Sequence, residues 1–117
     1  MTQRVLIVDD HPVFRASAMR LLRSNSYEVV GEAADGAEAL EAAQRLRPDV
    51  VLLDVGLPDS DGLEVARRLS EAQPELSIVL ISSRDREELE PLLADTPARG
   101  FIPKAELSAG ALASLTG

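Results

Sequence analysis

The segment Val5-Leu6-Ile7-Val8-Asp9-Asp10-His11-Pro12 (VLIVDDHP) joins four consecutive apolar residues directly to two adjacent carboxylates. An apolar run of this kind predicts a strand over residues 4–8 that is buried on both faces, as in a parallel sheet. Asp suits the turn that leads into a helix, and Pro12 suits a first helical turn. Two like charges at the end of a buried strand nevertheless repel each other and resist desolvation, so they require a further explanation.

Apolar runs at residues 27–33, 50–54, 78–81 and 100–102 predict four more strands. Helical segments are expected between the strands and after the last one: from Pro12 onward, over 36–46, from 63 onward, within 85–95 and over 106–115. A helix interior accepts Pro at a cost of about 3 kcal/mol. The fourth helix is therefore expected to be short or to begin near Pro91.

Strands that alternate with helices in this way predict an α/β fold with helices on both faces of a parallel sheet. Five strands favour the flavodoxin-like (βα)5 arrangement, a doubly wound sheet with strand order 2-1-3-4-5. The last strand would then lie at an edge, where Pro103 interrupts no interior ladder. Residues 1–117 are expected to form a single domain, with no output domain in this chain.

The composition excludes several classes of function. The net charge of −8 and the three aromatic residues argue against direct binding of nucleic acid by this chain. Cysteine is absent, which excludes disulfides and thiolate chemistry. No apolar run is long enough for a membrane span and the N-terminus lacks a signal-peptide pattern, so a cytoplasmic location without membrane attachment is expected.

Chemistry-bearing residues follow the predicted strands, and the carboxyl ends of parallel strands meet at one edge of a sheet. Asp9 and Asp10 follow the first strand, Asp54 ends the third, Ser82 follows the fourth, and Lys104 follows the fifth. Three crowded carboxylates favour a bound hard cation such as Mg²⁺. A carboxylate can itself act as a nucleophile that forms an aspartyl-phosphate, while a lysine and a hydroxyl neutralise the transferring phosphoryl group. His11, the single His, is expected on the loop before the first helix rather than as a ligand.

These residues carry a resemblance over essentially the whole chain. Asp9-Asp10, Asp54 in LLDVGLPDSDG, Ser82 in IVLISS and Lys104 in GFIPK resemble the receiver domain of two-component response regulators. DDHP and GFIPK are similar to receivers that often precede a helix-turn-helix output domain. A stand-alone receiver and a piece of a transcription factor both remain open.

The resemblance implies a role for each matching residue. Asp54 would be the phosphoacceptor, and Asp10, Asp54 and the backbone carbonyl of Gly56 would ligate Mg²⁺ directly. Asp9 would act mainly through a metal-bound water. Lys104 and Ser82 would hold phosphoryl oxygens. Phe101 matches the switch aromatic that rotates inward when Ser82 moves, although a simple core ring explains it equally well.

One position departs from the family pattern, and two others are expected to influence the lifetime of the phosphoryl group. Ala105 follows Lys104 where many receivers have Pro in a cis peptide, so the isomer of the Lys104–Ala105 bond stays open. Gly56 and Arg84 fall at the positions that, by resemblance, flank the path of attacking water. We expect Gly56 to leave this path open and Arg84 to cover it in part, which gives a moderate lifetime of the phosphoryl group.

The function implied is a phosphorylation-controlled switch. The chain would accept a phosphoryl group from a sensor histidine kinase or a small phosphodonor and signal to a downstream protein through the fourth helix, fifth strand and fifth helix. It would catalyse only its own phosphorylation and dephosphorylation, and the resemblance also allows a dimer that forms on phosphorylation. The alternatives are a phosphorylation-independent interaction module and an aspartyl-nucleophile Mg²⁺ phosphatase. Such phosphatases usually carry a second Asp two residues after the first, where this chain has Gly56.

Overall fold

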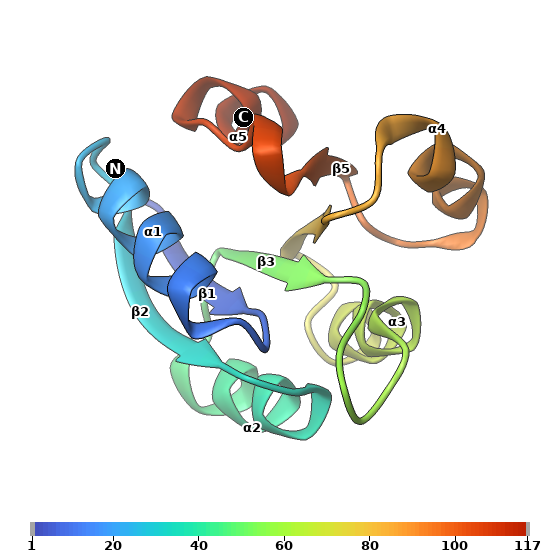
Figure 1. The fold of residues 1–117 in the computed structure, drawn as a ribbon. Helices are drawn as coiled ribbons and strands as arrows, with labels where there is room; N and C mark the ends of the chain where they lie inside the picture. Colours follow the sequence, from blue (N-terminus) through green and yellow to red (C-terminus); the bar gives the residue numbers. More distant parts are fainter. Residues whose placement is uncertain (1, 117) are drawn as a thin grey trace.

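The computed structural model describes residues 2–116, which form one parallel sheet with helices on both faces (Figure 1). The strands are β1 (Arg4–Val8), β2 (Glu28–Ala33), β3 (Val50–Asp54), β4 (Ser77–Ser82) and β5 (Gly100–Pro103). The helices are α1 (Pro12–Arg23), α2 (Gly36–Leu46), α3 (Gly62–Ala72), α4 (Arg86–Leu89) and α5 (Ala109–Thr116), with 3₁₀ turns η1 (Glu90–Asp95) and η2 (Lys104–Glu106).

The strand order is β2-β1-β3-β4-β5, with every neighbouring pair parallel, which confirms the predicted flavodoxin-like fold. β1 and β3 lie at the centre and are completely or almost completely buried, as their unbroken apolar runs predict. β5 lies at the edge, where Pro103 pairs with Ser82 as the last residue of the strand. This order brings the carboxyl ends of β1 and β3 together.

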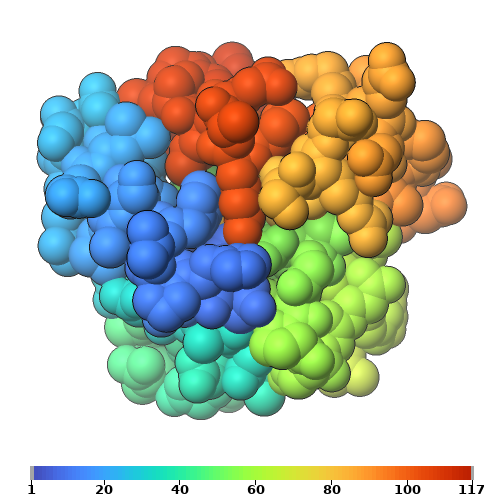
Figure 2. Space-filling model, viewed as in Figure 1, coloured from blue at the N-terminus to red at the C-terminus, as the bar shows by residue number. Residues whose placement is uncertain are grey.

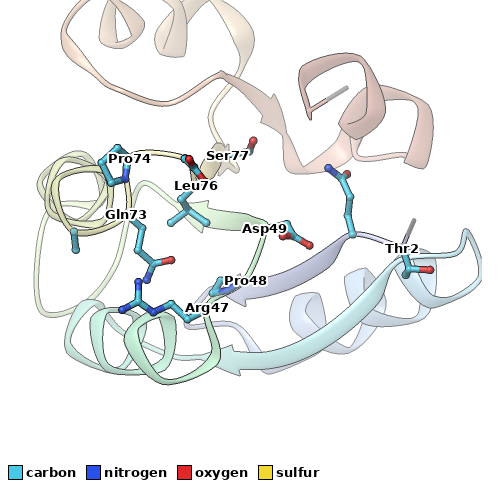
Figure 3. A pocket seen from close by; sticks show the side chains of 11 residues that line it. Thr2, Arg47, Pro48, Asp49, Gln73, Pro74, Leu76 and Ser77 are labelled. Atoms are coloured by element: carbon cyan, nitrogen blue, oxygen red, sulfur yellow. The ribbon is translucent and has the colours of Figure 1, made fainter.

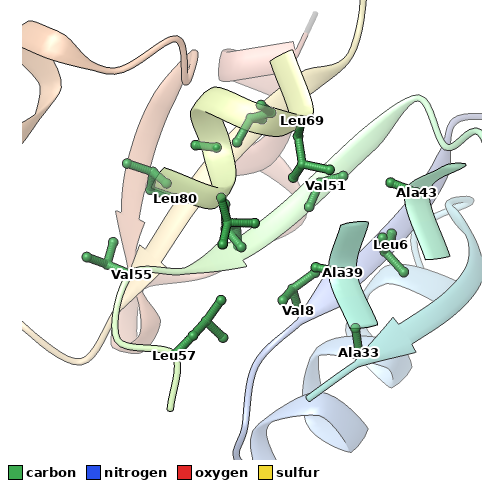
Figure 4. Packing of buried hydrophobic residues seen from close by; sticks show 14 of the residues in the cluster. Leu6, Val8, Ala33, Ala39, Ala43, Val51, Val55, Leu57, Leu69 and Leu80 are labelled. Carbon is green, nitrogen blue, oxygen red and sulfur yellow. The ribbon is translucent and has the colours of Figure 1, made fainter. Parts of the chain in front are cut away.

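Two apolar layers hold the helices against the sheet. α2, α3 and α4 cover one face, where Leu6, Val8 and Val51 of the sheet pack near Ala39 and Leu69 (Figure 4). α1 and α5 cover the other face through a cluster that contains Val5, Ile7, Ala18, Leu22 and Leu112. Because helices bury both faces, only the ends of the strands remain open to a ligand.

The helix boundaries agree with expectation except near the C-terminus. α4 is a single short helix, and Pro91 lies in the first turn of the 3₁₀ segment that follows, as the cost of an interior proline predicts. The predicted helix over 106–115 was wrong at its start, because α5 begins at Ala109. Leu107 is extended and the hydroxyl of Ser108 accepts a hydrogen bond from the Ala111 N–H at 3.0 Å, so the helix starts after this cap.

Candidate functional site

The predicted site residues meet at the carboxyl edge of the central strands. Figure 2 shows the segments near residues 10, 55 and 104, coloured blue, green and red-orange, converging at the centre of one face. One ligand atom from each of Asp9, Asp10, His11 and Asp54 lies within 4.8 Å of the others. The crowding of three carboxylates predicted from the sequence is therefore confirmed.

Asp9 is fully buried at the end of β1 and has a fixed orientation. Its Oδ1 accepts a hydrogen bond from the His11 N–H at 2.8 Å, and Nδ1 of His11 lies 3.0 Å from the same oxygen. Its Oδ2 forms an ion pair with the ammonium of Lys104 at 2.6 Å. The charge of Asp9 is thus balanced by Lys104 where water cannot reach it.

Asp10 is more open, with a side chain that is 31% exposed. Its buried Oδ1 makes no hydrogen bond among the described residues, although Nδ1 of His11 lies 3.1 Å away. Oδ2 of Asp9 is held by its ion pair with Lys104. A buried carboxylate oxygen without a hydrogen bond, crowded by two further carboxylates, fits a cation that would take these oxygens as ligands. The all-oxygen donors of Asp9, Asp10 and Asp54 suit Mg²⁺.

Asp54 ends β3 and is buried. Burial raises the pKa of its carboxyl group; the hydrogen bond from the Gly56 N–H opposes this shift, the charge of Asp9 adds to it, and Lys104 opposes it. The Gly56 N–H donates to Oδ1 at 3.0 Å, and the Lys104 ammonium lies 3.5 Å from Oδ2. A Cβ at Gly56 would lie 3.9 Å from Oδ1 of Asp54, so this loop position leaves the carboxylate approachable.

Lys104 reaches the cluster from the end of β5. Its ammonium also lies 4.7 Å from the centre of the Phe14 ring and 3.3 Å from Nδ1 of His11. The Lys104–Ala105 peptide is trans, which answers the question left open by the sequence. The face of the Phe14 ring and the carboxylates of Asp9 and Asp54 together hold the Lys104 ammonium in place.

The remaining predicted residues lie around this centre. Ser82 is buried, and its hydroxyl accepts a hydrogen bond from the Arg84 N–H at 3.0 Å. Arg84 is exposed and lines a cleft of about 500 Å³ beside the loop after β3. Phe101 is buried in the core layer under α4, with the Arg86 guanidinium 5.2 Å from its ring centre. Its role as a switch stays a prediction.

Three residues that the sequence did not single out for a site role also support it. His11, the N-cap of α1, places Nδ1 within 3.1 Å of both Asp9 and Asp10. Arg15 donates to the carbonyl of Asp9 at 2.5 Å and to Glu32 at 2.6 Å, which anchors the end of β1. Asp59 binds the first turn of α2. The position of His11 directly after two carboxylates could have indicated its role from the sequence. The contacts of Arg15 and Asp59 join different elements, so the local sequence does not show them.

A larger cleft lies at the opposite edge of the sheet, away from these groups. It has a volume of about 690 Å³, and its lining includes Thr2 and Asp49, which precede β1 and β3, and Ser77, the first residue of β4 (Figure 3). Volume therefore does not identify the chemical site, which is a shallow cluster at the carboxyl edge.

Comparison with known proteins agrees with this geometry. The family model of the response regulator receiver domain matches residues 5–114. The chain belongs to this family. The receiver is 37% identical to response regulator GacA of Pseudomonas viridiflava, over 86% of this chain and 48% of the relative. It is 34% identical to the transcriptional regulatory protein DegU of Brevibacillus brevis, over 93% of this chain and 46% of the relative.

The solved structures agree as well. The signal receiver domain of the putative response regulator NarL from Mycobacterium tuberculosis superposes with a TM-score of 0.85 and 37% identity, covering 99% of this chain and 98% of that one. The receiver spans about half the length of the curated relatives it matches. It is thus a receiver domain of two-component signalling, a class of signalling domain rather than a metabolic enzyme. Within residues 2–116, no helix combines the length and the apolar character that a membrane crossing requires.

Proposed function

We propose that this receiver accepts a phosphoryl group on Asp54 from a sensor histidine kinase or a small phosphodonor. The observation that carries the proposal is the buried Asp54 carboxylate, which lies beside Lys104 and in one cluster with the carboxylates of Asp9 and Asp10. Family membership supports the same chemistry. Asp54 attacks the phosphorus atom through one carboxylate oxygen, and the bond from phosphorus to the donor's leaving atom breaks.

Each residue of the site has a part in this proposal. Asp10, Asp54 and the Gly56 carbonyl would hold Mg²⁺ directly and Asp9 through water; the ion would neutralise charge on the phosphoryl oxygens. Lys104 moves from Asp9 toward a phosphoryl oxygen, and its position 3.5 Å from Asp54 supports this short path. Ser82 gives up its contact with the Arg84 N–H and donates a hydrogen bond from its hydroxyl to another phosphoryl oxygen.

The output is proposed to pass through α4, β5 and α5. Ser82 and Phe101 lie on β4 and β5 beneath this surface, so a shift of Ser82 would be transmitted to it. Several of the curated relatives are named as transcription regulators, and we infer a downstream protein, either an output domain or a separate partner. A phosphorylation-dependent dimer and a cytoplasmic location remain predictions.

The test is intact-mass analysis after incubation with acetyl phosphate, with and without Mg²⁺. We expect one phosphoryl group that requires Mg²⁺, is labile to hydroxylamine and is absent from an Asp54→Asn variant. Well-folded protein that stays unmodified would contradict the proposal and favour a phosphorylation-independent interaction module. Turnover of phosphate esters by the unmodified chain would instead favour the phosphatase, for which Gly56 lacks the second carboxylate.

A further inference from the structure

The loop between β3 and α3, residues 55–61, carries the Gly56 carbonyl that the proposed function assigns to the metal. The base of this loop is closed by the Gly62 N–H, which donates to the Val55 carbonyl at 3.1 Å. Gly62 is buried, and a Cβ there would approach the Asp54 carbonyl oxygen to 2.5 Å. The hydrogen bond and the close packing at Gly62 therefore hold the base of the loop, and both involve only residues at its two ends.

The tip of the loop is held differently. Oδ1 of Asp59 accepts a hydrogen bond from the Gly36 N–H at 2.7 Å, and Oδ2 accepts one from the Ala37 N–H at 3.2 Å. The Ser60 hydroxyl donates to Oδ1 of Asp59 at 3.1 Å. A Cβ on Gly36 would meet Oγ of Ser60 at 2.2 Å, so the loop and the first turn of α2 approach as closely as glycine permits.

α2 does not need these bonds to begin. Asp35 is its own N-cap and accepts a hydrogen bond from the Glu38 N–H at 2.8 Å, while the Glu38 carboxylate accepts one from the Ala34 N–H at 2.9 Å. This pair is a variant of the capping box, in which the Glu38 carboxylate reaches the N–H of the residue before the N-cap. Asp59 supplies a second set of acceptors from 22 and 23 residues away, and the element it immobilises is its own loop.

We propose that Asp59 is a positioning residue for metal binding, because it ties the tip of the Gly56 loop to the first turn of α2. The inference rests on the proposed function. The hydrogen bond from Gly36 lowers the pKa of Asp59, so the ionised form makes these contacts at neutral pH. Groups that orient metal ligands from outside the coordination sphere raise affinity because the ligand is ordered before the ion arrives.

The test is an NMR titration of the whole chain with Mg²⁺, followed through backbone amides. We expect Asp59→Ala to weaken Mg²⁺ binding about tenfold. Asp59→Asn keeps one carbonyl acceptor and loses the other oxygen, so its Mg²⁺ affinity should lie between those of the wild type and Asp59→Ala. The matched control is Asp35→Ala, which removes a cap of the same helix turn without touching the loop and should leave the affinity within about twofold.

Amide hydrogen exchange without Mg²⁺ gives an independent readout. Asp59→Ala should speed exchange at both Gly36 and Gly56. Asp35→Ala should leave the exchange rate at Gly56 unchanged. Equal losses of Mg²⁺ affinity in Asp59→Ala and Asp35→Ala would overturn the inference alone, because they would show a general effect of helix stability. A wild-type chain that fails to bind Mg²⁺ would overturn the proposed function and this inference with it. Should Asp59→Ala not fold, Asp59→Asn carries the same comparison.

Discussion

The ammonium nitrogen of Lys104 lies 2.6 Å from Oδ2 of Asp9 but 3.5 Å from Oδ2 of Asp54, so its closer partner is not the proposed acceptor. Asp9 is fully buried and the Lys104 side chain is 14% exposed. In this structure, Lys104 therefore serves first as the counter-ion of Asp9. Breaking a buried ion pair by removal of one partner leaves an uncompensated charge, which is strongly destabilising.

Lys104→Met should lower the free energy of unfolding of the metal-free receiver by about 3 kcal/mol. Mg²⁺ should restore part of this loss because a bound cation takes over the neutralisation of Asp9. Thermal denaturation in chelator and in saturating Mg²⁺ measures both effects, and the Mg²⁺-induced rise in Tm should be larger in the variant than in the wild type. Arg68→Met, which removes an exposed cation paired with Glu64, is the control. An equal rise in wild type and Lys104→Met would refute the counter-ion role.

Asp54→Asn should stabilise the metal-free receiver, since it removes a buried charge crowded by Asp9. The expected gain is roughly 1 kcal/mol, or about 4 °C in Tm. The raised pKa of Asp54 sets the sign of the pH dependence: the folded state takes up this proton more readily than the unfolded state, so the group destabilises folding at neutral pH and ceases to do so in acid. The Tm difference between Asp54→Asn and the wild type should be largest near neutral pH and vanish as the pH falls below 3.8, the ordinary pKa of an Asp carboxyl group. A difference that grows in acid would contradict this assignment.

Arg84→Ala should shorten the lifetime of the phosphorylated receiver by about threefold, less than 1 kcal/mol in the barrier. The Arg84 backbone N–H still donates to Ser82 in this variant, so the substitution isolates the side chain that we expect to cover the path of attacking water. Loss of the phosphoryl group can be followed by intact mass after removal of the donor, with Arg68→Ala as the control. An unchanged rate would mean that the Arg84 side chain does not shield the site.

The segment 85–95 should be the most rapidly exchanging part of the unphosphorylated receiver. α4 has a single buried residue, Leu89, and η1 has none. Elements with few buried contacts open locally at low free energy. Hydrogen exchange read by NMR tests this, and protection in this segment equal to that of β1 and β3 would count against it.

Much of the fold could be predicted because the local pattern is strong where the structure is most buried. β1 and β3 have the predicted boundaries, since each is an apolar run that ends in a carboxylate. The start of α5 was missed because a hydroxyl cap at Ser108 and an extended Leu107 decide it, and the apolar pattern over 106–115 shows neither.

The sequence by itself determined the alternation of strands and helices, the family, and the gathering of Asp9, Asp10, Asp54, Ser82 and Lys104 at one edge of the sheet. These follow from periodicity and from the residue types that end each strand. Only the tertiary structure decided that Lys104 pairs more closely with Asp9 than with Asp54, and that Asp59 binds the first turn of α2. Such contacts depend on distances between elements packed side by side, and no local pattern along the chain encodes those distances.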